Sequence, residues 1–158
     1  MKRILLLAAA TALAVCLSAG AAFAFGDRGQ GVTKTCQRDC DGTVYADSLT
    51  GTNNRNHIEG LGGKETPTFG DLIVGKRSAD TLYGNGGGDK VKGGRGDDYI
   101  SGGRGNDLLI GGSKNDRIDG GSGSDRIKVK DGYRDIVDCQ AGHDNVINRD
   151  PFDVLRNC

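Results

Sequence analysis

The chain has 158 residues, of which 28 are glycine, while only 5% are aromatic and none is tryptophan. So few large apolar side chains cannot fill the core of a conventional globular domain, and collagen is excluded because glycine has no three-residue period. The 21 basic and 21 acidic residues balance, which gives no indication of an electrostatic hold on nucleic acid or on an anionic membrane.

Residues 1–24 are expected to form a secretory signal peptide. A basic start, Lys2-Arg3, precedes an apolar run over residues 4–17, and Ala22-Phe23-Ala24 is an A-x-A cleavage site. The alternatives are a membrane anchor, for which the run is short, and a lipoprotein at Cys16, where the preceding valine fits poorly. Cleavage would leave a secreted, extracellular chain without a membrane span, in which residues 25–41 form a leader before the repeats.

From residue 42 onward a nine-residue period runs through the chain. Four units follow one another without a gap as GGRGDDYIS, GGRGNDLLI, GGSKNDRID and GGSGSDRIK, over residues 93–128. Two earlier units, Gly75–Tyr83 and Gly84–Lys92, keep the same phase. We therefore expect degenerate repeats with an insertion over 42–74, core repeats over 75–128, and degenerate repeats with a C-terminal cap over 129–158.

The sixth and eighth positions show the phase best. A disordered Gly/Asp-rich linker is the alternative, but it would need no such register. The sixth position holds Asp47, Asn56, Asp71, Asp80, Asp89, Asp98, Asp107, Asp116, Asp125, Asp135, Asp144 and Asp153. The eighth holds Leu49, Ile58, Ile73, Leu82, Val91, Ile100, Leu109, Ile118, Ile127, Val137, Val146 and Leu155. The register is broken by a loop expected near Glu65–Gly70, which contains Pro67, and by a one-residue slip near Val129–Tyr133.

The consensus G-G-x-G-x-D-x-aliphatic-x resembles the calcium-binding nonapeptide repeat of the repeats-in-toxin family. The resemblance is close over residues 75–128 and looser on either side. It implies an all-β fold, a right-handed parallel β-roll of about six coils with two repeats to a coil. Two parallel sheets would enclose two rows of aliphatic side chains, with the first six residues of each unit as a turn and the last three as a strand.

Calcium would stabilise such a roll in two ways. It would add contacts to a fold whose core is thin, and it would neutralise stacked carboxylates that repel one another. Calcium is a hard cation that takes about six to eight oxygen ligands from carboxylates and backbone carbonyls. The repeats offer oxygen rather than the imidazole or thiolate that zinc prefers. We therefore expect Ca²⁺ as the bound metal.

The resemblance implies that each ion lies between turns on the same edge of successive coils, which gives about four good sites. One edge would pair Asp80 with Asp98 and Asp98 with Asp116. The other edge would pair Asp89 with Asp107 and Asp107 with Asp125. The glycines expected to supply ligands are Gly87, Gly94, Gly96, Gly103, Gly105, Gly112, Gly121 and Gly123. Weaker sites are expected where Lys114 replaces a turn glycine and where Arg77 and Ser78 occupy another turn.

Four cysteines remain after cleavage, and an even number in an exported chain favours disulfides over metal ligation. Cys139 and Cys158 are one coil plus one residue apart, which would stack them at nearly the strand spacing and within disulfide reach. Cys36 and Cys40 are expected to pair with each other. Free thiols are the alternative.

The sequence offers no catalytic motif, since G-x-S-x-G and H-E-x-x-H are both absent. His57 and His143 lie in different units and are expected to be solvated, so we expect no enzyme and no catalytic residue. A calcium-stabilised extracellular structural or adhesive module is the favoured function. The alternatives are a calcium-dependent binding protein for a cell-surface partner, with Leu108 and Ile110 as an exposed apolar pair, and a hydrolase. We expect a monomer that binds no nucleic acid.

Overall fold

The computed structural model describes residues 32–43, 45–61 and 70–158, and every regular element in these ranges is a β-strand. The predicted signal peptide and the predicted loop near Glu65–Gly70 fall outside these ranges, except for Gly70. None of the described residues belongs to a helix long and apolar enough to cross a membrane.

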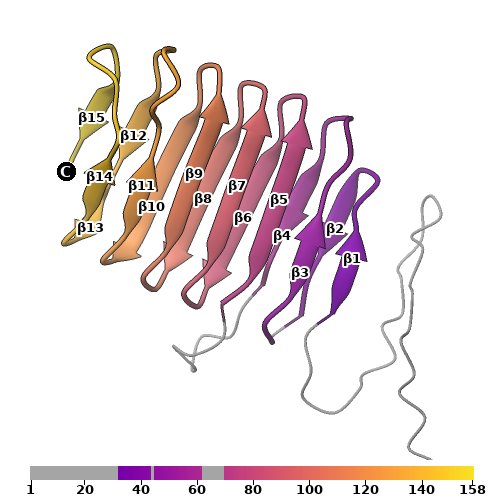
Figure 1. The fold of residues 1–158 in the computed structure, drawn as a ribbon. Coiled ribbons are helices and arrows are strands. Elements are labelled where there is room, and N and C mark those ends of the chain that lie inside the picture. The colour runs from indigo at the N-terminus through magenta and orange to yellow at the C-terminus, as the bar shows by residue number, and fades with distance from the viewer. Residues whose placement is uncertain (1–31, 44, 62–69) are drawn as a thin grey trace, which may run out of the picture.

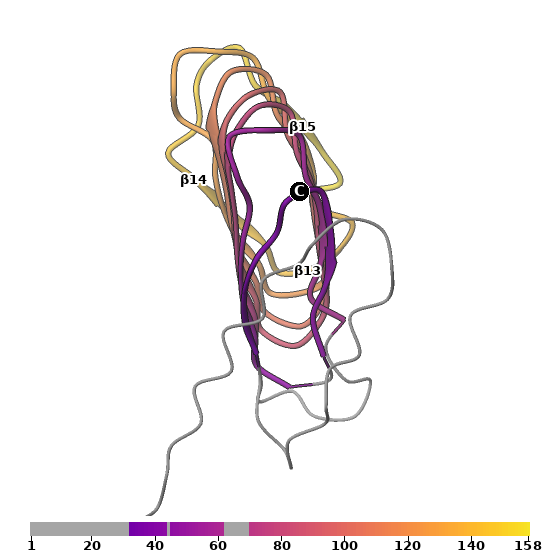
Figure 2. The same ribbon diagram turned by 90° about the vertical axis from the view of Figure 1, so that its right-hand side faces the viewer.

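The chain winds as a flattened solenoid of about six turns between two parallel sheets (Figures 1 and 2). The first sheet contains, in order, β1 (Thr33–Thr35), β3 (Ser48–Thr50), β5 (Leu72–Arg77), β7 (Lys90–Arg95), β9 (Leu108–Ser113), β11 (Arg126–Lys128) and β14 (Asn145–Ile147). The second contains β2 (Asp39–Asp41), β4 (His57–Glu59), β6 (Thr81–Gly86), β8 (Tyr99–Arg104), β10 (Arg117–Gly123), β12 (Ile136–Asp138) and β15 (Val154–Arg156), and β13 (Ala141–Gly142) pairs with β10. The predicted all-β parallel roll is confirmed.

The register between coils follows the nine-residue period. Lys90 of β7 lies opposite Leu108 of β9, and Tyr99 of β8 lies opposite Arg117 of β10, so each coil contains two repeats. After the predicted slip the offset grows by one residue, and Arg117 lies opposite Ile136. Each sheet therefore takes alternate repeats.

The strands of the core repeats are longer than predicted. We expected a six-residue turn and a three-residue strand, but β5 to β9 each span six residues. The first three residues of a unit continue the strand of the unit before, because they still pair between coils, as Lys76 does with Gly94 and Gly94 with Gly112. The turn proper is therefore only three residues long, and it ends on the aspartate.

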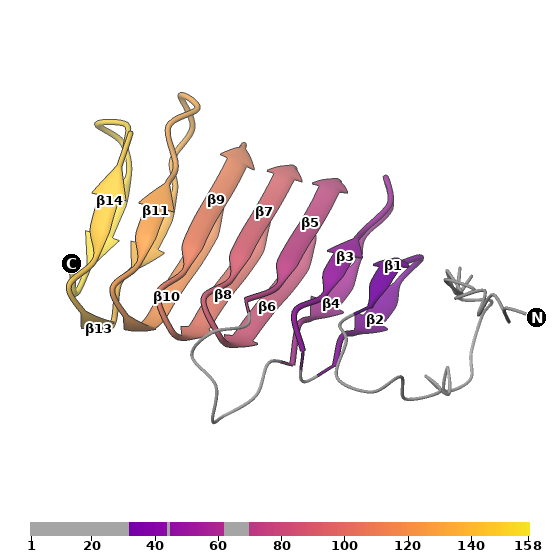
Figure 3. The ribbon, with the colours of Figure 1, turned by 60° about the horizontal axis from the view of Figure 1, so that its bottom comes forward.

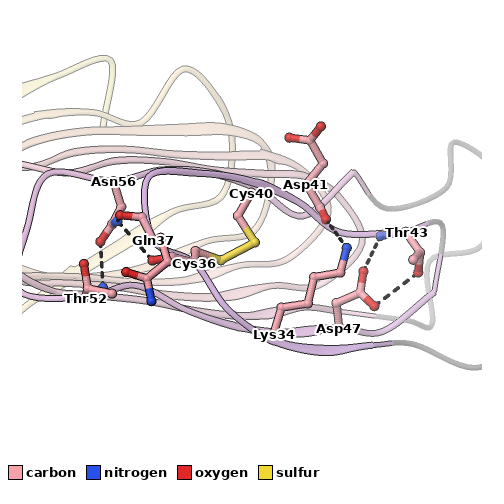
Figure 4. Close-up of a disulfide and its surroundings, with 9 residues drawn as sticks. All are labelled: Lys34, Cys36, Gln37, Cys40, Asp41, Thr43, Asp47, Thr52 and Asn56. Atoms are coloured by element: carbon pink, nitrogen blue, oxygen red, sulfur yellow. Dashed lines mark hydrogen bonds between the residues drawn. A yellow bond between two sulfur atoms is a disulfide. The ribbon is translucent and has the colours of Figure 1, made fainter. Parts of the chain in front are cut away.

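The solenoid begins earlier than the repeats do. Strands β1 and β2 pair with β3 and β4, so part of the segment expected as a leader contributes its own coil. Cys36, which directly follows β1, and Cys40 of β2 form the predicted disulfide, with their Cα atoms 5.4 Å apart (Figure 4). Lys34 occupies the register of the core residue Leu49 and donates from Nζ to the carbonyl oxygen of Asp41 at 2.8 Å. These contacts close the N-terminal end of the core.

The core consists of the predicted aliphatic rows. Ten of the twelve eighth-position residues are buried, and Val146 and Leu155 at the C-terminal end are partly buried and pack against them. Cys139 and Cys158 form the second predicted disulfide, with a Cα separation of 5.0 Å. It ties the chain's last residue to the preceding coil, where the aliphatic rows run out.

Candidate calcium-binding edges

The sixth-position aspartates form two ladders along the two edges of the roll. In each ladder, Oδ1 of one aspartate accepts a hydrogen bond from the backbone N–H of the aspartate one coil earlier. Along one edge Asp80 N–H donates to Asp98 at 2.8 Å, and Asp98 N–H donates to Asp116 at 2.9 Å. Along the other edge Asp89 N–H donates to Asp107 at 2.7 Å. The pairs expected from the sequence are therefore neighbours in space.

The ladders extend beyond the six predicted aspartates. The edge that holds Asp107 and Asp125 also includes Asp47, Asp71 and Asp144. The edge of Asp98 also includes Asn56, Asp135 and Asp153. The same sixth-position pattern identifies all of these residues, but the weak glycine pattern around them kept them out of the predicted set.

The ladder on the edge of Asp98 ends in a neutral residue. Asn56 uses its amide nitrogen to donate to the carbonyl oxygens of Cys36 and Gln37, both at 3.1 Å (Figure 4). An asparagine is thus satisfied at this position by the protein alone. In the aspartates that follow Asn56 along this edge, a carboxylate oxygen replaces the amide nitrogen. This oxygen cannot donate a hydrogen bond to a carbonyl group.

This second carboxylate oxygen is buried and has no hydrogen-bond partner in eight ladder aspartates. They are Asp71, Asp80, Asp89, Asp98, Asp107, Asp116, Asp125 and Asp135. A buried carboxylate oxygen without a partner is costly. Eight such oxygens recur at the same position of successive repeats. This indicates that the repeats bind a positively charged ligand between the coils.

Burial raises the pKa of these carboxyl groups. The pKa of Asp98 rises from 3.8 to about 6, that of Asp107 to about 7 and that of Asp116 to about 8, in each case mainly through loss of solvent. A pKa higher by about 2 corresponds to about 3 kcal/mol against the charged form. Because a domain is stable by only about 5–15 kcal/mol, a few such charges would offset most of its stability unless a cation balanced them.

The first glycine of each unit makes room beside the free oxygen. A Cβ at Gly75 would lie 2.5 Å from Asp80 Oδ2 and 2.6 Å from the carbonyl oxygen of Gly93 on the next coil. A Cβ at Gly120 would lie 2.9 Å from Asp125 Oδ2 and 2.9 Å from the Cys139 carbonyl oxygen. Carboxylate and carbonyl oxygens therefore converge on the same small space, and only glycine leaves it open.

The eight glycines predicted to supply carbonyl ligands all have positive φ, between 97° and 142°. The carbonyl oxygens of Gly87, Gly94, Gly103 and Gly105 face the glycine one coil later. A Cβ at Gly112 would meet the Gly94 carbonyl oxygen, and one at Gly105 would meet the Gly87 carbonyl oxygen. Among the described residues, no three carboxylate, imidazole or thiolate side chains converge on one point. A cation between these turns would therefore need backbone carbonyls as well as aspartates.

The two turns that depart from the consensus keep the same backbone. Lys114 has φ 91° and Ser78 has φ 76°, where the other core units have a positive-φ glycine. A residue with a side chain is strained in this conformation. The turn shape is therefore imposed by the neighbouring coils, and the local sequence opposes it at these two units.

Sequence reasoning missed the arrangement of the C-terminal turns. Asp150 accepts hydrogen bonds from the backbone N–H groups of Asp131 and Gly132, at 2.8 and 2.6 Å, and Asp131 accepts one from Lys114 at 2.6 Å. The two N–H donors at Asp150 lower the pKa of its carboxyl group. Side-chain oxygens here bond the turn backbone directly. Neither residue fits the repeat consensus, so only their acidity could have drawn attention to them.

The comparison with protein families agrees with this geometry. The model of the RTX calcium-binding nonapeptide repeat matches residues 41–66, 68–100 and 101–133, more than half of the chain. The chain belongs to the RTX calcium-binding repeat family. The comparison with curated proteins gave no match, and neither did that with solved structures.

RTX nonapeptide repeats bind Ca²⁺, and this chain is accordingly a calcium-binding β-roll. The unpaired oxygens and the carbonyls of the turn glycines fit a hard cation with oxygen ligands. Proteins with these repeats are generally structural or binding proteins rather than catalysts. His57 contacts Glu59 at 2.9 Å and packs against the Tyr83 ring, so it has a structural partner. That the chain has no catalytic residue stays a prediction.

Proposed function

We propose that the chain is a secreted protein whose fold is set by calcium and which serves outside the cell as a structural or adhesive module. The observation that supports this most is the pair of buried aspartate ladders with unpaired oxygens. Extracellular calcium is in the millimolar range at which weak modular sites fill, and RTX repeat proteins are typically secreted. The two disulfides fit an oxidising compartment.

In the proposed site, Oδ2 of a ladder aspartate and the carbonyl oxygens of the turn glycines hold each ion. The six core aspartates, from Asp80 to Asp125, would contribute the charge, and the positive-φ glycines from Gly87 to Gly123 would contribute the carbonyls. Calcium would balance the carboxylate charge and join successive coils. The ion would thus act on folding, since the ladder is unfavourable when charged and unbalanced.

Circular dichroism of the chelated protein during a calcium titration tests the calcium part. We expect the β signal to grow with calcium and not with equal magnesium, which keeps its water shell and demands a stricter geometry. Asp98→Asn should raise the calcium midpoint, whereas Asp97→Asn, an exposed neighbour, should not. A full β signal in chelator that calcium does not change would contradict the proposal.

Export needs a separate test. The protein in the culture medium of its natural host should begin at Phe25, which the sequence of its N-terminal peptide would show. A chain that stays in the cell with residues 1–24 attached would refute the secreted role and leave calcium binding untouched.

A further inference from the structure

The outer face of the first sheet differs sharply from that of the second. Its outward side chains are those at the seventh and ninth positions, which alternate with buried core residues along each strand. On β5, β7, β9 and β11 these residues are Leu72, Val74, Lys90, Lys92, Leu108, Ile110, Arg126 and Lys128. No acidic or aromatic residue occupies an outward position of any strand of this sheet. We call this surface the basic face; its strands lie side by side in Figure 3.

The second sheet carries the acidic residues instead. Beside its buried core residues this sheet carries Asp39, Asp41, Glu59, Asp119 and Asp138. The basic residues at these positions are Arg117 and Arg156, and Arg104 is exposed at the end of β8. The balanced formal charge of the whole chain therefore conceals an uneven distribution. One flat side of the roll is cationic, and the opposite side is mostly anionic.

Basic and aliphatic residues alternate in rows across the basic face. Lys90 and Lys92 lie opposite Leu108 and Ile110, which in turn lie opposite Arg126 and Lys128. Neighbouring strands are about 4.8 Å apart, so the two basic rows are about 10 Å apart with an aliphatic row between them. Leu72 and Val74 form a further aliphatic row beside Lys90 and Lys92, and Leu72 is 40% exposed.

The four cations of the basic face are Lys90, Lys92, Arg126 and Lys128. Within the described part of the chain none of them forms an ion pair. The positive charge is therefore available to a partner. The partner must be anionic, and it must also accept aliphatic side chains on a flat surface.

We propose that the basic face binds the surface of an anionic lipid bilayer. Interfacial binding combines buried apolar area with attraction between basic residues and anionic headgroups, and the alternating rows supply both. An acidic polysaccharide would satisfy the charge but not the aliphatic rows, and the aromatic side chains that stack on sugars are absent from this face. The observations therefore favour lipid.

The inference requires the folded roll but not the extracellular role or the calcium ligands proposed above. Each basic residue near an anionic membrane contributes roughly a fivefold gain in binding, at about 1 kcal/mol per residue. Removing Lys90 and Lys92 together should thus weaken binding about 25-fold. Binding should also weaken with salt, because exposed charges are screened.

Co-sedimentation of the calcium-loaded protein with lipid vesicles tests the proposal. Vesicles of phosphatidylglycerol and phosphatidylcholine in equal parts should bind it, and pure phosphatidylcholine vesicles should not. Lys90→Gln with Lys92→Gln should weaken binding about 25-fold. Arg117→Gln with Arg156→Gln, on the opposite face, should leave it unchanged or strengthen it. Circular dichroism in calcium checks that each variant folds. If the Lys90→Gln, Lys92→Gln variant does not fold, Arg126→Gln with Lys128→Gln is used in its place.

Several results would overturn the proposal. Equal binding by the Lys90/Lys92 variant would show that the basic face is not the contact. An equal loss in the Arg117/Arg156 variant would show that charge acts without regard to face. Retention on immobilised alginate, lost in the Lys90/Lys92 variant, together with no binding to vesicles would assign the face to an acidic polysaccharide instead. Failure of the vesicle test with a normal calcium transition would leave the calcium-dependent fold intact.

Discussion

Acid should stabilise the calcium-free protein, because its ladder aspartates hold protons that the unfolded chain releases. Burial raises the pKa of Asp107 and Asp135 to about 7 and that of Asp116 to about 8, whereas the ordinary value is 3.8. Between those values the folded state binds more protons than the unfolded state, so its stability falls as the pH rises. Between pH 5 and its own pKa, each group lowers the free energy of unfolding by about 1.4 kcal/mol for each unit by which the pH rises.

Raising the pH from 5 to 7 should therefore remove roughly 7 kcal/mol from the calcium-free fold through these three groups alone. That loss is comparable with the whole stability of a typical domain, about 5–15 kcal/mol. We expect the chelated protein, with its disulfides intact, to lose β signal in circular dichroism as the pH rises from 5 to 8. In saturating calcium the dependence should reverse, since calcium binds the deprotonated carboxylates and acid competes with it.

A matched pair of variants locates the effect. Asp116→Asn removes the group with the highest pKa and should flatten the pH profile of the chelated protein, while Asp39→Asn, an exposed residue on β2, should leave it unchanged. A chelated protein that gains β structure as the pH rises, or whose β content ignores pH, would refute the reasoning from buried carboxylates.

Three further predictions concern particular turns and ends of the roll. Gly102→Ala should abolish the calcium-induced β signal or cost more than about 3 kcal/mol in urea unfolding, because its Cβ would strike the Asp107 carboxylate and the Gly120 carbonyl; the exposed Gly88, with one contact at 3.2 Å, should tolerate alanine far better. Lys114→Gly should raise stability by about 1 kcal/mol by relieving a positive φ, which a higher melting temperature in calcium would show and an unchanged or lower one would contradict. Cys158→Ser should cost about 3 kcal/mol and speed hydrogen exchange in β14 and β15 while sparing β7 and β8; uniform loss of protection would mean that the C-terminal disulfide supports the whole roll.

The repeat pattern was sufficient to predict the two-sheet roll, because only a nine-residue period puts Asp98 beside Asp116 and Ile100 beside Ile118 one coil later. It also predicted the Cys139–Cys158 disulfide, since stacking brings Cys158 within reach of Cys139. The same period could not reveal the coil formed by β1 and β2. There Lys34 takes the place of an aliphatic residue, and Cys40 is the residue in register with Ile58, so backbone pairing persists where the sequence pattern does not.

The sequence indicated the role of the aspartates but not the hydrogen bonding of their two carboxylate oxygens. The consensus indicates a calcium ligand, but it does not show that Oδ1 is engaged with the backbone of the previous coil and that Oδ2 is free. That division depends on how the coils stack. The net charge also gave no indication of the basic face, because the charges of the cationic and anionic faces sum to zero.

A crystal structure of the calcium-loaded protein, with an anomalous difference map recorded at a wavelength where calcium scatters, would locate the ions. We expect peaks along both edges, between successive turns. Each peak should lie about 2.3–2.6 Å from Oδ2 of a core aspartate, such as Asp98 or Asp107, and from backbone carbonyl oxygens. Peaks confined to exposed carboxylates, with the ladder Oδ2 atoms still without a partner, would contradict the proposed calcium sites.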